Sequence, residues 1–372
     1  MSKRLGSFAF LVSGLIGLAC GSSEGTQTAA VPAPPPDEQP APKAPPAKPP
    51  AAVDAGDGLD ACATSRTVAE SVPLYLVVFL DKSGSMGWDP IDMVDNTSER
   101  WTPVTSALES FFETATADTN ASLQFFPLDA ADAVRCEATN YATMPVAMTQ
   151  LPDNTAFKAA IGATTPKGST PTLAALKAGL TYAEQVRNDL ATQKKSGKVV
   201  MVMATDGSPY GCGAANTLEA SAKEAQAVAH MVPTYVIGVG PKLQQLDTIA
   251  QAGGTTSAIL VPVTNPTQTA TDFRHALDNI RGHAISCSYA LPKLKPGEVL
   301  DPTRVNVTST PAGGLPGVMP YDQNCSGGAG WRYDDPNSPT RIELCDVSCE
   351  SVQKEGAIDV VVGCKTVPAN QR

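Results

Sequence analysis

Basic residues and histidines are scarce in this sequence, and their scarcity limits what the protein can do. Lys and Arg total 27 against 37 Asp and Glu, which gives a formal net charge of -10. A nucleic-acid binder needs positive charge to neutralise phosphates, so we expect no nucleic-acid partner. The three histidines, His230, His275 and His283, fall within or at the end of expected helices, where a His is more often a surface or packing residue than a catalytic base.

Sequence patterns of common hydrolases and phosphotransferases are also missing. Ser83 and Ser85 are not set in the Gly-x-Ser-x-Gly pattern of a nucleophile elbow. A phosphotransferase with Asp81 as its nucleophile would need a second Asp two positions on, where Ser83 stands. We therefore expect that the protein is not an enzyme, and a metal-dependent hydrolase is kept only as a lesser alternative.

A membrane-spanning run is missing at the N-terminus. The apolar run Phe8–Ala19 follows Lys3 and Arg4 and is too short to cross a bilayer comfortably, so it predicts a signal peptide over residues 1–20. Cys20 ends the run and resembles the Cys that is lipidated in bacterial lipoproteins, although Gly17 stands where that signal prefers Leu. We expect an exported protein held at the membrane only by a lipid on Cys20, with plain secretion as the alternative.

Residues 21–60 consist largely of Pro and Ala and contain few bulky apolar side chains. This composition predicts a disordered, extended tether that holds the rest of the chain away from the membrane. Gly21, rather than Asp, follows Cys20, which resembles lipoproteins passed on to an outer membrane. The expected location is therefore the bacterial cell envelope, at the outer membrane.

The cysteines beyond Cys20 predict disulfide bonds, because their number is even in a chain expected to be exported. They are Cys62, Cys136, Cys212, Cys287, Cys325, Cys345, Cys349 and Cys364. Eight cysteines allow 105 pairings, so the connectivity stays open. Cys136 and Cys212 lie in loops expected on one face and are predicted to pair, and Cys62 could pair with the C-terminal region. Zinc is disfavoured at Cys345 and Cys349, because no second close Cys pair accompanies them.

Short β-rich segments alternate with helical segments between residues 72 and 284. The expected strands are 74–80, 121–126, 198–204, 233–239 and 258–263, and the expected helices are 102–113, 154–162, 172–191, 217–230, 243–252 and 267–283. Residues 76–80 and 199–203 are apolar at nearly every position, as in strands buried on both faces. The pattern predicts an α/β domain with a doubly wound, mostly parallel sheet and helices on both faces.

Residues 285–372 have a different sequence pattern and contain five of the eight remaining cysteines. Short alternating runs, Val305–Val307, Arg341–Leu344 and Ile358–Val362, are divided by turns. They predict a small, disulfide-rich β unit. The turn at Asp334 and Asp335 is expected to be solvated, with Ca²⁺ binding as the alternative.

Polar side chains follow the first expected strand, which ends in the sequence Asp81-Lys82-Ser83-Gly84-Ser85. In open α/β sheets, ligands bind at the carboxyl ends of the strands, so these side chains stand where a site is expected. Their convergence is attributed to a tight turn at Gly84. After this motif, residues 87–101 form a long insertion with Trp88, Asp89, Asp92 and Asp95, expected as a solvated loop; a rim that selects partners or holds a second ion is the alternative.

Two further segments accompany the Asp-x-Ser-x-Ser loop: residues 167–172 open a long helix, and a buried strand ends in Asp206. In this order, over residues 72–284, the segments resemble the metal-ion-dependent adhesion site of the von Willebrand factor type A (VWA) family. The resemblance implies one divalent ion held by Asp81, Ser83, Ser85, Thr170 and Asp206. Thr170 is preferred to Thr172 because of its distance to the small residue Ala174 in the following helix.

Such a site suits Mg²⁺, which prefers oxygen ligands, with Mn²⁺ or Ca²⁺ as alternatives. The family implies that the serines bind directly, that one or both Asp act through water or hold the serines, and that an open position receives an Asp or Glu of a protein partner. We therefore expect a cell-envelope lipoprotein that binds a protein through a metal bridge. The alternative is a structural envelope or assembly component with a merely stabilising metal site.

Overall fold

The computed structural model describes residues 58–59, 61–89, 94–292, 299–311 and 314–369. The predicted signal peptide, lipidated Cys20 and nearly all of the Pro/Ala-rich tether lie outside these residues. Within the described ranges, no helix is both long enough and apolar enough to cross a membrane.

A six-stranded sheet lies at the centre of the fold, in the order β6-β5-β2-β7-β8-β9. All neighbouring strands are parallel except β6, which runs antiparallel to β5 at one edge. This confirms the predicted doubly wound, mostly parallel sheet, whereas β6 was not expected from the sequence. The strands are β2 (Leu74–Asp81), β5 (Thr119–Phe126), β6 (Val146–Gln150), β7 (Lys198–Thr205), β8 (Thr234–Val239) and β9 (Ile259–Val261).

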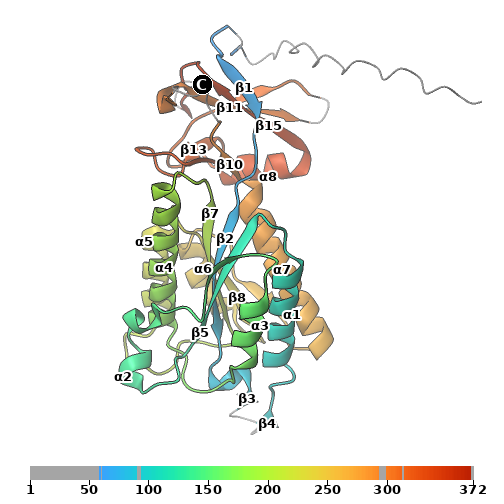
Figure 1. Cartoon of the computed structure of the whole chain (residues 1–372), viewed down its shortest axis with the longest axis vertical. Helices are drawn as coiled ribbons and strands as arrows, with labels where there is room; N and C mark the ends of the chain where they lie inside the picture. The colour runs from blue at the N-terminus through green and yellow to red at the C-terminus, as the bar shows by residue number, and fades with distance from the viewer. Residues whose placement is uncertain (1–57, 60, 90–93, 293–298, 312–313, 370–372) are drawn as a thin grey trace, which may run out of the picture. The chain divides into compact units, whose positions relative to one another are not determined.

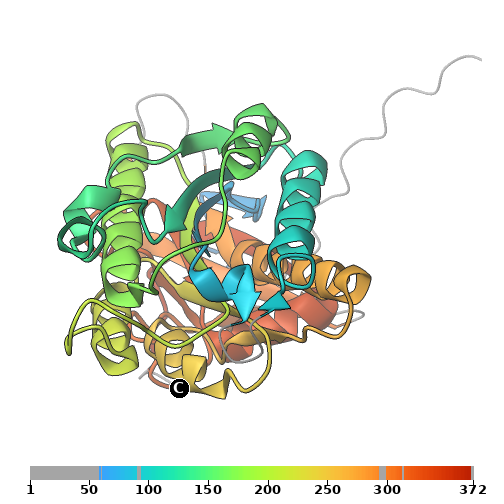
Figure 2. The same ribbon diagram turned by 90° about the horizontal axis from the view of Figure 1, so that it is seen from below.

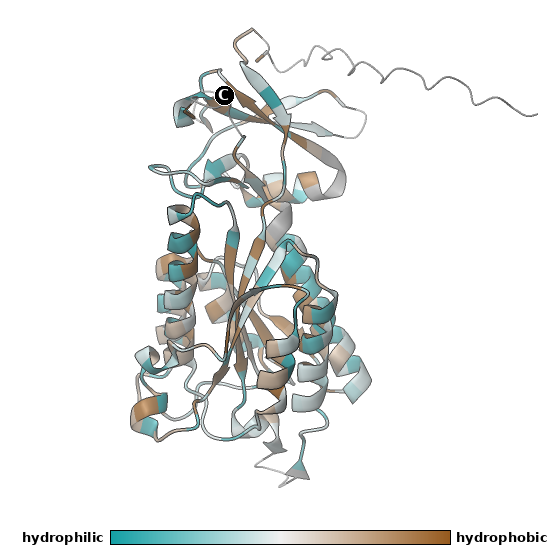
Figure 3. Cartoon of the chain, viewed as in Figure 1, coloured by the Kyte–Doolittle hydropathy of each residue, from teal (hydrophilic) through white to brown (hydrophobic). Residues whose placement is uncertain are grey.

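Helices cover both faces of this sheet, as Figures 1 and 2 show. Val78 and Leu80 of β2 pack in one core with α1 (Trp101–Thr114), α3 (Thr155–Gly162) and α7 (Pro266–Ser286). Val77 and Phe79 point to the opposite core, with α4 (Thr172–Thr192), α5 (Leu218–Val228) and α6 (Asp247–Ala252). Since successive side chains of a strand face opposite ways, β2 must be apolar at nearly every position, and Figure 3 shows this hydrophobic centre.

In its described residues, the C-terminal region forms two small antiparallel sheets, the helix α8 and a short 3₁₀ turn, Pro302–Arg304. The first sheet has the order β1-β15-β11-β12, and the second has the order β10-β14-β13. Strand β1 comes from residues that precede the central sheet in the chain and pairs along β15, with Ser65 opposite Val362. The elements are β1 (Ser65–Val68), β10 (Ser288–Ala290), β11 (Val305–Pro311), β12 (Gly317–Met319), β13 (Trp331–Tyr333), β14 (Arg341–Leu344), α8 (Asp346–Glu355) and β15 (Gly356–Val362).

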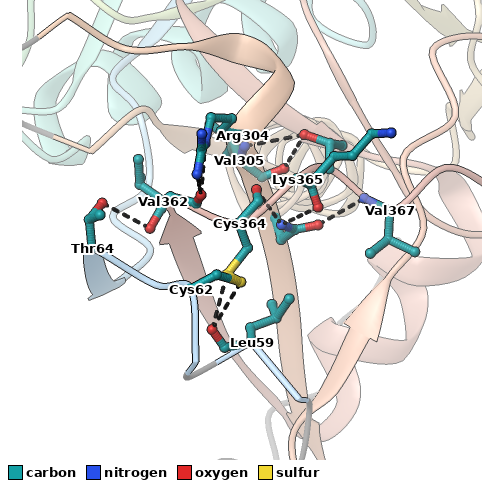
Figure 4. The surroundings of a disulfide bond; sticks show 12 residues. Leu59, Cys62, Thr64, Arg304, Val305, Val362, Cys364, Lys365 and Val367 are labelled. Carbon is teal, nitrogen blue, oxygen red and sulfur yellow. Dashed lines mark hydrogen bonds between the residues drawn. A yellow bond between two sulfur atoms is a disulfide. The ribbon is translucent and has the colours of Figure 1, made fainter.

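All eight cysteines beyond Cys20 form disulfide bonds, which join Cys62 to Cys364, Cys136 to Cys212, Cys287 to Cys349, and Cys325 to Cys345. The predicted Cys136–Cys212 pair is present. Figure 4 shows how Cys62 ties the start of the described chain to the end of β15. The zinc alternative is wrong, because Cys345 and Cys349 belong to two different disulfides.

The expectation of a solvated turn at Asp334 and Asp335 is wrong for Asp334, whereas Asp335 is half-buried and the next three residues are exposed. The Asp334 side chain is buried, accepts hydrogen bonds from the Thr340 and Arg341 backbone N–H groups at 2.8 and 3.1 Å, and pairs with the Arg341 guanidinium at 3.2 Å. A buried carboxylate whose oxygens are engaged in this way is a structural group of the turn.

Candidate functional site

Asp81, the last residue of β2, connects the parts of the candidate site through hydrogen bonds. Its side chain is fully buried, and its Oδ1 accepts a hydrogen bond from the backbone N–H of Ser83 at 2.6 Å. Its Oδ2 accepts from the hydroxyl of Thr205 at 2.6 Å. Thr205 ends the neighbouring strand β7, so Asp81 fixes its own loop and links two strand ends.

The two serines of the loop lie side by side. Their Oγ atoms are 3.0 Å apart, and Ser85 Oγ donates to Oδ1 of Asp206 at 2.7 Å. Asp206 directly follows β7, so a side chain from the first strand end meets one from the second. The structure therefore brings Asp81, Ser83, Ser85 and Asp206 into one hydrogen-bonded group at the carboxyl edge of the sheet.

Gly168, rather than Gly84, occupies a position that favours glycine. Gly84 begins a short 3₁₀ turn, Gly84–Met86, and its backbone N–H donates to the carbonyl of Gly168 at 3.0 Å. Gly168 has φ +94°, and a Cβ there would come within 2.8 Å of Arg135 Nη1 and 2.9 Å of Pro127 Cγ. Gly168 therefore combines a left-handed backbone conformation with a lack of space for a side chain against Arg135 and Pro127, and both favour glycine.

Thr170 lies in this second loop, and its position is fixed through its backbone. Its N–H and carbonyl pair with Tyr210 at 2.9 and 3.0 Å, and the carbonyl also accepts from Asn216 Nδ2 at 2.9 Å. Asn216 Oδ1 in turn accepts from the N–H of Leu173 in the first turn of α4. No hydrogen bond in the described part of the chain joins the Thr170 hydroxyl to the serines or to Asp206, so its part in the site stays a prediction.

Arg100 also belongs to the candidate site, although the sequence gives no sign of it. Its Nη1 donates to Oδ2 of Asp206 at 2.8 Å and to the carbonyl of Ser85 at 3.2 Å. Asn96 Nδ2 donates to the same Ser85 carbonyl at 3.2 Å. Both residues belong to the insertion, and no motif marks them, because an isolated Arg or Asn in a polar loop has no characteristic spacing.

The expectation that this insertion is wholly solvated is therefore wrong. It begins with a short hairpin, β3 (Trp88–Asp89) paired with β4 (Val94–Asp95), and then returns to the site at Asn96. The backbone N–H of Asn96 donates to the Gly87 carbonyl at 3.3 Å, which closes the base of the insertion. Asp92 lies outside the described residues.

Burial dominates the electrostatics of the two site carboxylates. Loss of solvent and the nearby charge of Asp206 raise the pKa of Asp81 to about 7. Burial also raises the pKa of Asp206, against the opposing effects of the Ser85 hydrogen bond and the Arg100 charge. Lys82 does not relieve this negative charge, because its Nζ pairs with Asp129.

These residues fit a hard divalent cation. Two buried carboxylates lie close together without full compensation, and the hydroxyls beside them are neutral oxygen donors of the kind that Mg²⁺ accepts. Among the described residues, no group of three or more His, Cys, Asp or Glu could hold a metal. An ion at this edge would therefore depend on serine and threonine hydroxyls and on water, with Asp81 and Asp206 as its only carboxylates.

The fold and the site define a doubly wound α/β domain whose polar loops gather at the carboxyl edge of a mostly parallel sheet. The family model for the von Willebrand factor type A domain matches residues 76–276. The chain belongs to this family. A comparison with curated protein sequences finds no significant match.

Solved structures with a related fold are remote from this chain. The VWA domain of SpRpn10 is 12% identical, with 53% of this chain and 94% of that chain covered and a TM-score of 0.37. The domain of the type V pili tip protein Mfa5 from Porphyromonas gingivalis is 14% identical, with 63% and 100% covered and a TM-score of 0.38. The pilus adhesin SpaC from Lactobacillus rhamnosus GG is 12% identical, with 78% and 39% covered and a TM-score of 0.40.

Proposed function

We propose that this protein binds another protein through a divalent metal ion held at the carboxyl edge of the central sheet. The observation that carries the proposal is the hydrogen-bonded group in which Ser83 and Ser85 of one loop meet Asp206 at the end of the neighbouring strand. Mg²⁺ is the first candidate, with Mn²⁺ or Ca²⁺ as alternatives. When bound, the ion supplies an electrophilic position for a carboxylate oxygen of the partner, an Asp or Glu.

The residues of this chain have separate tasks in the proposal. The hydroxyl oxygens of Ser83, Ser85 and Thr170 bind the ion directly. Asp81 holds the loop through the Ser83 N–H and supplies negative charge, and Asp206 orients the Ser85 hydroxyl. The proposed role is binding and not catalysis.

Exposed aromatic side chains near the site favour a protein as the partner. Trp88, in the hairpin that follows the serine loop, is 44% exposed, and Tyr210, whose backbone pairs with Thr170, is 74% exposed. Aromatic residues are enriched where proteins bind one another. An open cavity of about 540 Å³ adjoins Gly168 and is lined by Asp129, Arg135 and Lys167 among others.

We further propose export and a lipid anchor at Cys20, in keeping with the four disulfides.

The experiment is a titration with Mn²⁺, followed by electron paramagnetic resonance, on the exported full chain with Cys20→Ser. Asp81→Ala should abolish Mn²⁺ binding, since it removes a buried carboxylate and the anchor of the serine loop. Asp153→Ala is the matched control, because Asp153 is exposed and far from the loop in sequence. Unchanged Mn²⁺ affinity in Asp81→Ala would refute the metal site.

A second measurement tests the open position. Acetate, a minimal mimic of an Asp or Glu side chain, should reduce the water-proton relaxation caused by bound Mn²⁺, because a carboxylate displaces water from the ion. A relaxation rate that acetate leaves unchanged would argue for the alternative, a metal site that only stabilises the fold.

A further inference from the structure

The insertion after the serine loop places a positive charge directly on the candidate metal site. Asn96 and Arg100 both donate to the Ser85 carbonyl at 3.2 Å, and Thr97 Oγ1 donates to the Gly87 carbonyl at 3.1 Å. These bonds hold the end of the insertion against the loop. Arg100 is therefore a fixed part of the site and not a solvated side chain.

The guanidinium of Arg100 engages the one oxygen of Asp206 that the serines leave free. Nη1 is 2.8 Å from Oδ2, while Oδ1 accepts from Ser85 Oγ at 2.7 Å. The Asp206 side chain is fully buried, and that of Arg100 is 17% exposed. A charge-assisted hydrogen bond in such a place, with little solvent screening, is much stronger than a surface ion pair.

Arg100 also lies over the next strand end. A Cβ at Gly240, just after β8, would come within 4.0 Å of its guanidinium carbon and Nη2. Arg100 Nε is buried and has no hydrogen-bond partner in the described part of the chain. The guanidinium is thus held mainly by its attraction to Asp206, and not by a complete set of hydrogen bonds.

We infer that Arg100 is a built-in cation that competes with the divalent ion for the negative charge of Asp81 and Asp206. The inference rests on the proposed function for the presence of that ion. In the metal-free protein, Arg100 partly offsets the charge of Asp206 and stabilises the loop arrangement. A bound divalent ion and Arg100 repel each other, so each binding event must overcome the charge of the guanidinium or displace it from Asp206. Arg100 thereby sets the metal concentration at which the site fills.

The test compares Mn²⁺ affinity and metal-free thermal stability in four proteins: the parent full chain, Arg100→Gln, Arg100→Lys and Lys158→Gln. Lys158 pairs with Glu113 at the surface, where both side chains are exposed, and controls for the change in net charge. Arg100→Gln should lower the Kd for Mn²⁺ about tenfold, within the usual range of coupling between two sites. It should also lower the metal-free Tm by several degrees, because Asp206 loses its partner. Arg100→Lys should stay near the parent, and Lys158→Gln should change neither quantity.

The outcomes separate this inference from the proposed function. Mn²⁺ binding by the parent with no gain in Arg100→Gln would overturn the competition and leave the metal site standing. If Arg100→Gln binds Mn²⁺ and the other three proteins do not, the inference is strongly supported. Failure of all four proteins to bind Mn²⁺ would overturn both proposals. If Arg100→Gln folds poorly, Arg100→Lys takes its place in the test. A Kd for Mn²⁺ in Arg100→Lys that is equal to or higher than that of the parent supports the inference. A tenfold lower Kd contradicts it.

Discussion

Lys198 Nζ lies 2.6 Å from Glu343 Oε1, and both side chains are almost completely buried. Lys198 begins β7 and Glu343 lies in β14, so the pair joins the amino end of the central sheet to the C-terminal unit. Glu343 also accepts from Arg332 and Arg341, at 2.8 and 2.9 Å, and Arg341 donates to the Gly197 carbonyl. The contact is opposite the candidate metal site, which lies at the carboxyl ends of the same strands.

Glu343→Gln should therefore destabilise the protein strongly. The substitution leaves Lys198 and two arginines without their shared carboxylate, and breaking a buried ion pair in this way costs about 3–5 kcal/mol. Urea unfolding at pH 7 measures the loss. Glu113→Gln is the matched control, because Glu113 is exposed and pairs with Lys158 only at the surface, so its effect should stay within about 0.5 kcal/mol. Equal effects of the two substitutions would contradict this account.

Acid should remove the same stabilisation. Burial alone raises the pKa of Glu343, but the charges of Lys198, Arg341 and Arg332 lower it well below its usual value. The unfolded chain therefore takes up a proton before the folded protein does, and the contribution present at neutral pH is lost as the pH falls below about 4.5. The difference in unfolding free energy between the parent and Glu343→Gln should shrink from pH 7 to pH 3. A constant difference would show that Glu343 does not act through its charge.

The sequence predicts the strands of the central sheet better than it predicts what contacts them. Strand β7 was predictable because burial on both faces requires apolar residues at every position, while the edge strand β6 is short and only partly buried. The pair formed by Lys198 and Glu343 spans 145 positions, and no local pattern indicates that a charged residue will find so distant a partner. For the same reason β1, which pairs with β15, was assigned no place in a sheet.

The metal-free protein should lose stability as the pH rises through about 7. Burial and the charge of Asp206 raise the pKa of Asp81 from 3.8 to about 7. Between these values the folded protein keeps a proton that the unfolded chain has released, so this contribution is present below about pH 4 and lost above pH 7. It is on the order of 4 kcal/mol. Unfolding in EDTA from pH 4 to 8 measures it, and Asp81→Asn should abolish this part of the pH dependence; an identical profile would exclude Asp81.

Loss of the Cys62–Cys364 disulfide should weaken the C-terminal unit and leave the metal site unchanged. The bond links positions 302 residues apart and adjoins the pairing of β1 with β15. The double variant Cys62→Ser, Cys364→Ser should lower the free energy of unfolding by about 2–5 kcal/mol. Its Kd for Mn²⁺ should equal that of the parent, because the bond adjoins β1 and β15, whereas Ser83 follows the carboxyl end of β2.

Removal of the Cys136–Cys212 disulfide is the matched comparison. It should weaken Mn²⁺ binding, unlike removal of the Cys62–Cys364 bond. Cys212 follows Tyr210 by two residues, and Tyr210 pairs with Thr170 through both of its backbone groups. Without the bond, the loop that holds Thr170 loses a constraint, and the Kd for Mn²⁺ should rise several-fold. If the two double variants bind Mn²⁺ equally well, the loop does not depend on this disulfide.

The candidate site shows where prediction from the sequence ends. The resemblance to the VWA family is what placed Asp81 and Asp206 together, and the structure shows that they follow parallel neighbouring strands whose carboxyl ends meet at one edge. The serines followed from their positions just after Asp81. Arg100 could not be placed, because its contact with Asp206 depends on how the insertion folds back, which no periodicity in the sequence specifies.

The choice between Thr170 and Thr172 can be settled by three substitutions. Thr172 begins α4, is 1% exposed, and its hydroxyl lies 3.4 Å from the Thr170 carbonyl, so Thr172→Ala should cost about 1 kcal/mol of stability without changing Mn²⁺ affinity. Thr170→Ala removes a proposed ligand and should raise the Kd at least about tenfold, since losses of even outer-shell groups cost 10–100-fold. Thr170→Ser keeps the hydroxyl and should restore the affinity. Weaker Mn²⁺ binding in Thr172→Ala alone would move the ligand role to Thr172, because only the hydroxyl in contact with the ion affects its affinity directly.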